Sequence, residues 1–321
     1  MKVLVLGCRG WGEVHLRALS KLGVELSVYA RTSEAVEECA SKFEVSSTFT
    51  DINQALHSDA DVVDVVLPHD LHAPVSVKAM KLGKDVTVEK PIAASLREAQ
   101  EMTSTSRSSG RKLMVTEQFH FDPSVKRTKE IVESGKIGKV HTVIVRSQLR
   151  WSGSGWRREA SHMGGGALID GGVHFADTLL QLGGEYEDVA GYTYKGAGLI
   201  EGEDTGMAVF KFKGGAHGFF FYTWAYPNPP PVPRFEVVGS DGSVVDDVWN
   251  RPKGRMAPYG PLLVNGVRED VEDQDLYTSM FSQFFKAVEE GTDVPFPPEL
   301  AVADLKAILD VYDASEKRRR V

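Results

Sequence analysis

The chain opens with Met1-Lys-Val-Leu-Val-Leu6, which runs directly into Gly7-Cys8-Arg9-Gly10-Trp11-Gly12. The first six residues are mostly apolar, and we interpret them as a buried strand. The stretch from Gly12 to Leu22 then reads as a helix. A glycine-rich turn between a strand and a helix is typical of the first unit of a doubly wound α/β sheet. This stretch therefore predicts the class of fold.

The same alternation of strand and helix continues through the first third of the chain. The predicted strands after the first are 24–30, 61–67, 85–89 and 113–116, and the predicted helices include 33–42, 72–82 and 95–110. Asp61–Leu67 is rich in valine, as expected of a parallel strand that is buried on both faces. The pattern predicts an N-terminal Rossmann domain, a doubly wound parallel sheet, over residues 1–119.

The pattern changes after this point. Strand-like runs follow one another with short turns such as Lys213-Gly-Gly215 and Ser240-Asp-Gly242, which is typical of antiparallel pairing. These runs are 140–150, 190–194, 206–212, 217–224, 234–238 and 243–248. One helix, from about 165 to 182, interrupts them, and two more end the chain. We predict that residues 120–321 form an α+β domain with a large, mostly antiparallel open sheet.

The composition restricts the classes of protein that this chain can belong to. Its 321 residues are 42% hydrophobic and 26% charged, values typical of globular proteins, and the length suits two domains. The net charge of −8 argues against a nucleic-acid partner. No apolar run is long enough to span a membrane, and the apolar start is too short for a signal peptide. Two cysteines provide no disulfide framework, so we predict a cytoplasmic protein.

The glycine turn predicts a dinucleotide site, because a pyrophosphate rests on the exposed amides of such a helix. Gly7 and Gly12 match the first and third glycines of the usual motif, whereas Arg9 occupies the place of the second and a glycine follows at Gly10. Arg9 would crowd the phosphates unless its guanidinium turns outward and pairs with one of them. The alternative to a dinucleotide site is that Gly7-Cys8-Arg9-Gly10-Trp11-Gly12 forms only a tight turn between strand and helix.

The end of the second predicted strand bears on the choice between NAD and NADP. An NAD-selective site places an acidic residue there, to bind the ribose hydroxyls. The sequence instead reads Tyr29-Ala-Arg31-Thr32-Ser33, which suits a 2′-phosphate. We therefore predict NADP as the preferred cofactor, with NAD as the alternative. Arg31 could also be an ordinary solvated surface residue.

Three further stretches carry reactive side chains. Asp85-Val-Thr-Val-Glu89-Lys90-Pro91 ends a strand at the carboxyl edge, where α/β sheets bind ligands. Gly164-Gly-Gly-Ala-Leu-Ile-Asp170-Gly-Gly-Val-His174 places a carboxylate and an imidazole four residues apart on one predicted helix face. Thr116-Glu117-Gln-Phe-His120-Phe-Asp-Pro123 lies between the predicted domains.

Together with Pro68-His69-Asp-Leu-His72 and Gly83-Lys-Asp-Val86, these stretches resemble the glucose–fructose oxidoreductase and inositol dehydrogenase (Gfo/Idh/MocA) family. The resemblance runs from the first strand to the last helix. It implies a Rossmann domain followed by a substrate-binding and oligomerisation domain over residues 120–321, an open sheet whose uncovered face makes homodimers or homotetramers. It also implies an NAD(P)-dependent dehydrogenase or reductase acting on the CH–OH group of a sugar, cyclitol or sugar-like substrate.

The resemblance assigns roles to individual residues of this chain. Lys90, Asp170 and His174 would be catalytic, with His174 as the general base, since the pKa of an imidazole lies near the working pH. The expected contacts to the cofactor are Gly7, Arg9, Gly10, Trp11, Gly12, Arg31, Thr32, Ser33, Pro68, His69, His72, Glu89 and Lys90. The expected contacts to the substrate are Lys90, Glu117, His120, Trp156, Arg157, Asp170 and His174. The chain departs from its relatives at His69, where many have asparagine, and at His120, where many have arginine.

Other interpretations stay open for these patterns. Lys90 could be a surface lysine at the end of a strand, and Asp170 with His174 a structural pair on a helix. Within the same family, a dinucleotide-sensing regulator without catalysis and a nicotinamide-assisted glycoside hydrolase are the alternative functions. The histidines match no compact metal motif, so we expect no metal.

Overall fold

The computed structural model describes residues 1–319, which fall into two compact units. Unit 1 comprises Met1–Glu117 and Tyr277–Val302, and unit 2 comprises Gln118–Leu276 and the segment from Ala303 onward. The first division lies two residues before the predicted boundary at 119/120. The segment Tyr277–Val302 departs from the predicted division, which placed it in the second domain. It packs with unit 1 because aromatic residues of its helix contact the helix that follows the glycine turn.

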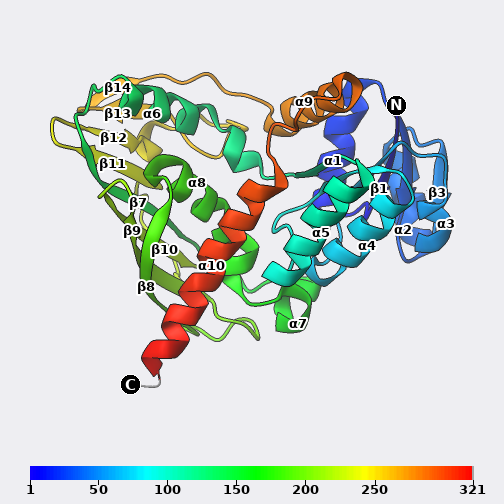
Figure 1. Cartoon of the computed structure of the whole chain (residues 1–321), viewed down its shortest axis with the longest axis horizontal. Coiled ribbons are helices and arrows are strands. Elements are labelled where there is room, and N and C mark those ends of the chain that lie inside the picture. Colours follow the sequence, from blue (N-terminus) through cyan, green and yellow to red (C-terminus); the bar gives the residue numbers. More distant parts are fainter. Residues whose placement is uncertain (320–321) are drawn as a thin grey trace. The chain divides into compact units, whose positions relative to one another are not determined.

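Unit 1 contains a parallel six-stranded sheet in the order β3-β2-β1-β4-β5-β6, which confirms the predicted Rossmann fold (Figure 1). Its strands are β1 (Lys2–Leu6), β2 (Glu25–Tyr29), β3 (Ser47–Phe49), β4 (Val62–Val65), β5 (Asp85–Val88) and β6 (Leu113–Val115). The central strands β1, β4 and β5 are almost wholly buried, which explains their continuous apolar runs. The short strand β3 has no such run, and the sequence analysis assigns no strand there.

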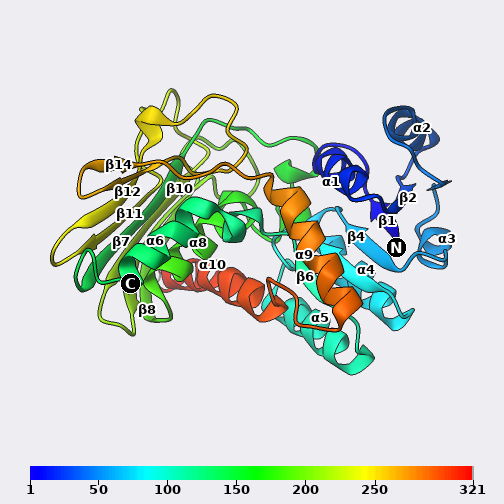
Figure 2. The same cartoon turned by 90° about the horizontal axis from the view of Figure 1, so that it is seen from above.

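Helices cover both faces of this sheet. Figure 2 shows α4 and α5 on one side of the sheet and α1 and α9 on the other. The helices of the unit are α1 (Trp11–Leu19), α2 (Ser33–Lys42), α3 (Ile52–Leu56), α4 (His69–Lys81), α5 (Leu96–Ser109) and α9 (Leu276–Glu290). Their starts follow from capping: Thr32, Asp51 and Ser95 each accept a hydrogen bond from a backbone amide of the first turn.

Unit 2 contains an eight-stranded sheet in the order β14-β13-β12-β11-β7-β10-β9-β8. Its strands are β7 (Val140–Gln148), β8 (Tyr186–Tyr194), β9 (Thr205–Phe212), β10 (His217–Thr223), β11 (Phe235–Gly239), β12 (Ser243–Asp246), β13 (Leu262–Val264) and β14 (Val267–Glu269). All neighbouring strands are antiparallel except β7 and β10. The predicted, mostly antiparallel sheet is confirmed.

Helices α6 (Pro123–Glu133), α8 (Val173–Gly183) and α10 (Pro298–Arg319) lie along one face of this sheet (Figure 2). Several large apolar side chains on the opposite face are partly exposed, next to exposed polar residues such as Lys211 and His217. Val209 of β9 is 47% exposed and its cross-strand partner Phe219 of β10 is 39% exposed. Tyr192 and Tyr194 of β8 are also exposed. Within the described part of the chain, helices therefore cover one face of the sheet, whereas the other face is partly exposed.

None of the helices in residues 1–319 is both long and apolar enough to cross a membrane.

Candidate functional site

The glycine turn closes against the neighbouring strand without room for side chains. A Cβ on Gly7 would lie 2.1 Å from the carbonyl oxygen of Val66, and one on Gly12 would lie 1.7 Å from that of Gly7. Gly10 precedes α1 with φ +62°, and a Cβ there would meet open space. The first turn of α1 has no side-chain cap, and the amides of Gly12 and Glu13 donate to the carbonyl oxygens of Arg9 and Gly10. These features fit a bound phosphate group.

Arg9 turns outward from this turn, but its partners are carboxylates. Its guanidinium lies 2.6 Å from Glu38 and 3.5 Å from Glu34, both on α2. The pKa of Glu38 is lowered by its hydrogen bonds to Lys42 and Arg9. All these side chains are largely solvent-exposed. Arg9 therefore ties the glycine turn to α2.

Arg31, Thr32 and Ser33 lie at the carboxyl end of β2, where α2 begins. All three are exposed. Thr32 caps α2 by accepting a hydrogen bond of 3.3 Å from the amide of Ala35. The predicted cation and hydroxyl groups are thus accessible at one helix N-terminus, which is the polarity that an anionic group prefers.

A buried charged cluster joins α1 to the ends of two strands. Nδ1 of His15 is 2.9 Å from Asp64 on β4, and Nε2 is 2.9 Å from Glu89, which follows β5. Burial opposes a charge on this imidazole, but the charge and hydrogen bond of Asp64, together with Glu89, raise its pKa to about 10. The imidazolium therefore links the helix of the glycine turn to two adjacent strand ends. Sequence analysis did not find this cluster, because its members are 25 or more residues apart along the chain.

Lys90 follows Glu89 directly and is buried, with a cis peptide bond to Pro91. His72 braces this segment, since its ring nitrogens lie 2.8 Å from the carbonyl oxygen of Pro91 and 2.9 Å from that of Leu67. Burial and the neighbouring His69 lower the pKa of His72 to about 4, against the effect of its two carbonyl partners, which raise it. His72 is fully buried, and its contacts hold the backbone of Leu67 and Pro91 in place. A direct contact between His72 and the cofactor would therefore need a change of conformation.

His69 starts α4 immediately after Pro68, at the same edge of the sheet, and is buried. Glu117 ends unit 1 two residues after β6 and is buried as well. Trp11 is 42% exposed and lies 6.2 Å, between ring centroids, from Tyr277 of α9. The carboxyl edge of the Rossmann sheet thus collects all the residues of unit 1 that the sequence analysis singled out.

In unit 2, Asp170 and His174 lie on a helical segment that is not a uniform α-helix. Residues Leu168–Gly172 form a π-helical turn, and α8 continues from Val173. The helix predicted from about 165 to 182 is at the right place, but it begins at about Leu168 and its first turn is π-helical. A Cβ on Gly171 would lie 2.0 Å from the hydroxyl of Tyr222 on β10, so only glycine lets this turn approach the sheet. π-turns inside helices are frequent at functional sites.

Asp170 is held by a loop that the sequence analysis had associated with the substrate. Nε of Arg157 lies 3.2 Å from Oδ1 of Asp170, and both side chains are mostly buried. The guanidinium of Arg157 also lies over the ring of Trp156, 4.3 Å from its centroid. The structure therefore brings three of the predicted substrate-site residues together.

His174 stacks on a ring that the sequence analysis quoted but did not single out. The imidazole and the phenyl ring of Phe119 have centroids 4.4 Å apart and planes inclined by 14°. Next to Phe119, Nδ1 of His120 lies 2.9 Å from Oδ1 of Asp177, one turn along α8 from His174. Segment 119–120 thus contacts α8 at two consecutive turns. The clue in the sequence is that Phe119 lies within the stretch 116–123.

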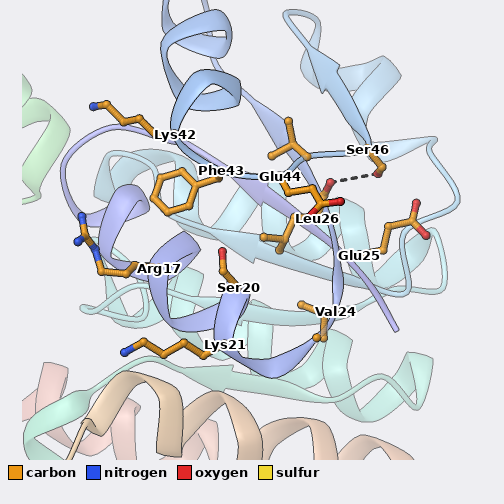
Figure 3. Close-up of a pocket in the computed structure, with 12 residues that line it drawn as sticks. Arg17, Ser20, Lys21, Val24, Glu25, Leu26, Lys42, Phe43, Glu44 and Ser46 are labelled. Atoms are coloured by element: carbon orange, nitrogen blue, oxygen red, sulfur yellow. Dashed lines mark hydrogen bonds between the residues drawn. The ribbon is translucent and has the colours of Figure 1, made fainter.

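The structure also has an open groove of about 790 Å³ at the opposite, amino edge of the Rossmann sheet. Figure 3 shows its lining from the end of α1, the start of β2 and the loop after α2, where Ser46 donates a hydrogen bond to the carbonyl of Leu26. It includes none of the predicted site residues. Ligands of open α/β sheets bind at the carboxyl edge, so we assign it no role.

Among residues 1–319, no group of three or more His, Cys, Asp or Glu side chains could hold a metal ion. The histidines that the sequence analysis noted contact carboxylates, carbonyls or aromatic rings instead.

Comparison with known proteins agrees with this architecture. Residues 1–117 match the model for an oxidoreductase family with an NAD-binding Rossmann fold, and residues 125–245 match the GFO/IDH/MocA C-terminal domain. The chain is similar to an uncharacterised protein of Saccharomyces cerevisiae, with 30% identity over 68% of this chain and 62% of that protein. It is 28% identical to the scyllo-inositol 2-dehydrogenase (NADP⁺) IolU of Bacillus subtilis, over 71% of this chain and 69% of that one.

Among solved structures, an oxidoreductase of Thermotoga maritima superimposes with a TM-score of 0.87 at 26% identity, over 98% of this chain and 96% of that one. The fold and these matches define the class: an oxidoreductase with an NAD(P)-binding Rossmann fold. Within that class, the chain belongs to the Gfo/Idh/MocA family.

Proposed function

We propose that this protein transfers a hydride between NAD(P) and a secondary alcohol or carbonyl of a sugar, cyclitol or sugar-like substrate. The observation that carries the proposal is the buried pair on the helix of unit 2. Asp170 is held by Arg157, and the imidazole of His174 is stacked on Phe119. A carboxylate and an imidazole with restricted orientation suit proton transfer better than a pair of surface residues does.

In this proposal unit 1 binds the dinucleotide. The turn formed by Gly7, Gly10 and Gly12 would hold the pyrophosphate, because it lies at the N-terminus of α1, which has no side-chain cap, and a Cβ on Gly10 would meet open space. Arg31, with Thr32 and Ser33, would bind a 2′-phosphate, which makes NADP the preferred cofactor. The NADP dependence stated in the name of the Bacillus relative supports this choice. The bound nicotinamide supplies the hydride acceptor or donor.

The side chains of this chain would then handle the proton and the charge. His174 takes the proton of the substrate hydroxyl when the alcohol is oxidised and returns it in the reverse direction. Lys90 stabilises the negative charge that develops on the reacting oxygen. Asp170 orients the substrate and tunes the imidazole. These roles rest on the family motif, and the buried environment of each side chain supports them.

The substrate class rests on two kinds of support. Arg157 lies beside Asp170 and over the ring of Trp156, and an aromatic ring with a guanidinium suits the C–H groups and hydroxyls of a polyol. Glu117 and His120 are the further contacts expected from the motif. The name of the Bacillus relative states a cyclitol as its substrate.

We also propose a homodimer or homotetramer formed through the apolar outer face of the unit 2 sheet, and a cytoplasmic location. A monomeric protein rarely leaves an apolar sheet face of this kind exposed to solvent.

A panel of sugars, cyclitols and their oxidised forms, scored by absorbance of the reduced nicotinamide, tests the proposed reaction. Turnover with at least one polyol is the expected result. Binding of NAD(P)H without turnover of any of them would favour a dinucleotide sensor. Release of a chromogenic aglycone without net cofactor reduction would favour a glycoside hydrolase.

A further inference from the structure

Glu203 lies in the loop just before β9 and contacts the start of the helical segment that carries Asp170. Its carbonyl oxygen accepts a hydrogen bond of 2.8 Å from the amide of Ala167. Its side-chain Oε1 accepts a second, of 2.9 Å, from the amide of Leu168. The segment has no side-chain cap of its own at this end. Glu203 therefore takes the place of the missing local cap from a distant part of the chain.

A third hydrogen bond fixes the carboxylate itself. The hydroxyl of Tyr312 on α10 donates to the same Oε1 at 2.8 Å. The carboxylate is thus held between two elements, and a change in its position would be transmitted to the first helical turn. Burial raises the pKa of Glu203 to about 7, despite its hydrogen bonds from Leu168 and Tyr312.

The backbones at this contact are too close for side chains. A Cβ on Gly166 would lie 2.0 Å from the carbonyl oxygen of Glu203, and one on Gly202 would lie 2.4 Å from that of Gly165. The short distance between the two backbones explains why glycine is required at position 166, a few residues before Asp170. The contact is therefore a close backbone approach.

The same loop also holds the segment that supplies the partner of Asp170. The amide of Glu201 donates to the carbonyl oxygen of Arg158 at 3.0 Å, and its carboxylate accepts from the amide of Ala160 at 3.2 Å. Residues 201–203 therefore contact the chain both just after Arg157 and just before Asp170, the two members of the ion pair. The loop can therefore hold Arg157 and Asp170 in place without touching a substrate itself.

We propose that Glu203 is a positioning residue that sets the π-helical turn of Asp170 and, through it, the placement of His174. This inference rests on the proposed function, since it assigns a role in turnover. A displacement of a reacting group by about 1 Å can lower a rate by about a hundredfold, which gives the scale of the expected effect.

Three variants separate positioning from general stability. Glu203→Ala removes the acceptor, whereas Glu203→Gln keeps an oxygen that can accept from Leu168 and Tyr312. Tyr312→Phe removes the third hydrogen bond. The matched control is Ser315→Ala on the same helix, which removes a hydroxyl that accepts from the amide of Thr193 on β8 instead.

We expect kcat to fall by about 10- to 100-fold in Glu203→Ala and to stay within about threefold of the unaltered protein in Glu203→Gln. Tyr312→Phe should lie between them. Cofactor Kd should not change in any variant, because the glycine turn belongs to unit 1. Ser315→Ala should lower the melting temperature without lowering kcat. Activity is measured well below the melting temperature of every variant.

Hydrogen exchange supplies a readout that does not depend on turnover. Amides of residues 167–174 should exchange at least about tenfold faster in Glu203→Ala, and as slowly as in the unaltered protein in Glu203→Gln and Ser315→Ala. Unchanged exchange in Glu203→Ala would overturn the inference, as would equal loss of kcat in the Ala and Gln variants. Failure of the proposed function shows separately, as absence of polyol turnover in the unaltered protein; the exchange result then decides the positioning on its own.

Discussion

The imidazole of His174 lies face to face on the phenyl ring of Phe119, with 4.4 Å between the centroids and 14° between the planes. Because a stacked ring cannot rotate freely about its χ2 bond, this contact restricts the directions in which the imidazole nitrogens point. The contact also joins α8 to the segment that follows the Rossmann domain in sequence. It is the relationship on which an assignment of His174 as a proton acceptor depends most directly.

Phe119→Leu should keep the fold and lower turnover by about tenfold, because a leucine fills most of the space but leaves the imidazole plane unrestricted. The measurement is kcat for the best substrate of the polyol panel. Phe285→Leu, a buried change on α9 of unit 1, is the matched control and should keep its kcat. Equal kcat values for Phe119→Leu and the unaltered protein would contradict a role for the stack.

His174→Ala should bind the cofactor normally and lose turnover by about 10²- to 10⁴-fold, the usual share of general acid–base catalysis. Lys90→Ala should also lose turnover, and the double variant should lose much less than the two losses multiplied, because both act on one oxygen. Single-turnover hydride transfer and the melting temperature are measured together, with His141→Ala, an exposed histidine of β7, as control. A His174→Ala protein that melts early but transfers hydride at the original rate would show a structural Asp170–His174 pair.

NADP(H) should bind more tightly than NAD(H), because Arg31 is exposed beside the N-terminus of α2. A charge-assisted phosphate contact is worth about 1.5–3 kcal/mol, or roughly ten- to a hundredfold in affinity. Calorimetric titration of the unaltered protein, Arg31→Ala and the exposed control Arg17→Ala measures this. The prediction fails if NAD(H) binds more tightly, or if Arg31→Ala keeps its NADP(H) affinity.

Unit 1 should lose stability as the pH rises from about 6.5 towards 10. The pKa of His15 is raised to about 10 in the folded protein, so the imidazolium contributes stability fully below the unfolded pKa and loses it as pH rises through the folded one. Denaturant midpoints between pH 6 and 9.5 should fall for the unaltered protein and change much less for His15→Gln. The exposed His57→Gln should behave like the unaltered protein. A His15→Gln protein with the same pH dependence as the unaltered one would refute an imidazolium at this position.

The protein should form dimers or larger assemblies at micromolar concentration, well above its monomer mass of 35.2 kDa. Val209→Asp and Phe219→Asp should each shift it towards the monomer, because they place charges in the middle of the apolar outer face of the sheet. Light scattering measures the mass. Leu300→Asp, at an exposed apolar position elsewhere, should leave the mass unchanged. A monomeric unaltered protein would contradict the prediction.

The sequence by itself determined the Rossmann domain and the position of most of its elements. Its parallel strands are buried on both faces, so each leaves a continuous apolar run, and α2 begins where Thr32 caps it. The glycine turn could also be predicted from the sequence, because a Cβ on Gly7 or Gly12 would collide with neighbouring backbone, so glycine is required at both positions. The stretch from Gly164 to His174 pointed to the helix of unit 2 by its motif.

Tertiary structure alone decided what these residues contact. His15, Asp64 and Glu89 form one cluster although 25 to 49 residues separate neighbours along the chain, and Glu203 caps a helix that starts 35 residues earlier. The π-helical turn at Asp170 and the return of Tyr277–Val302 to unit 1 were likewise absent from the local pattern. Periodicity and capping report on neighbours within one or two turns, whereas hydrogen bonds between distant segments depend on how the elements pack, which no local pattern encodes.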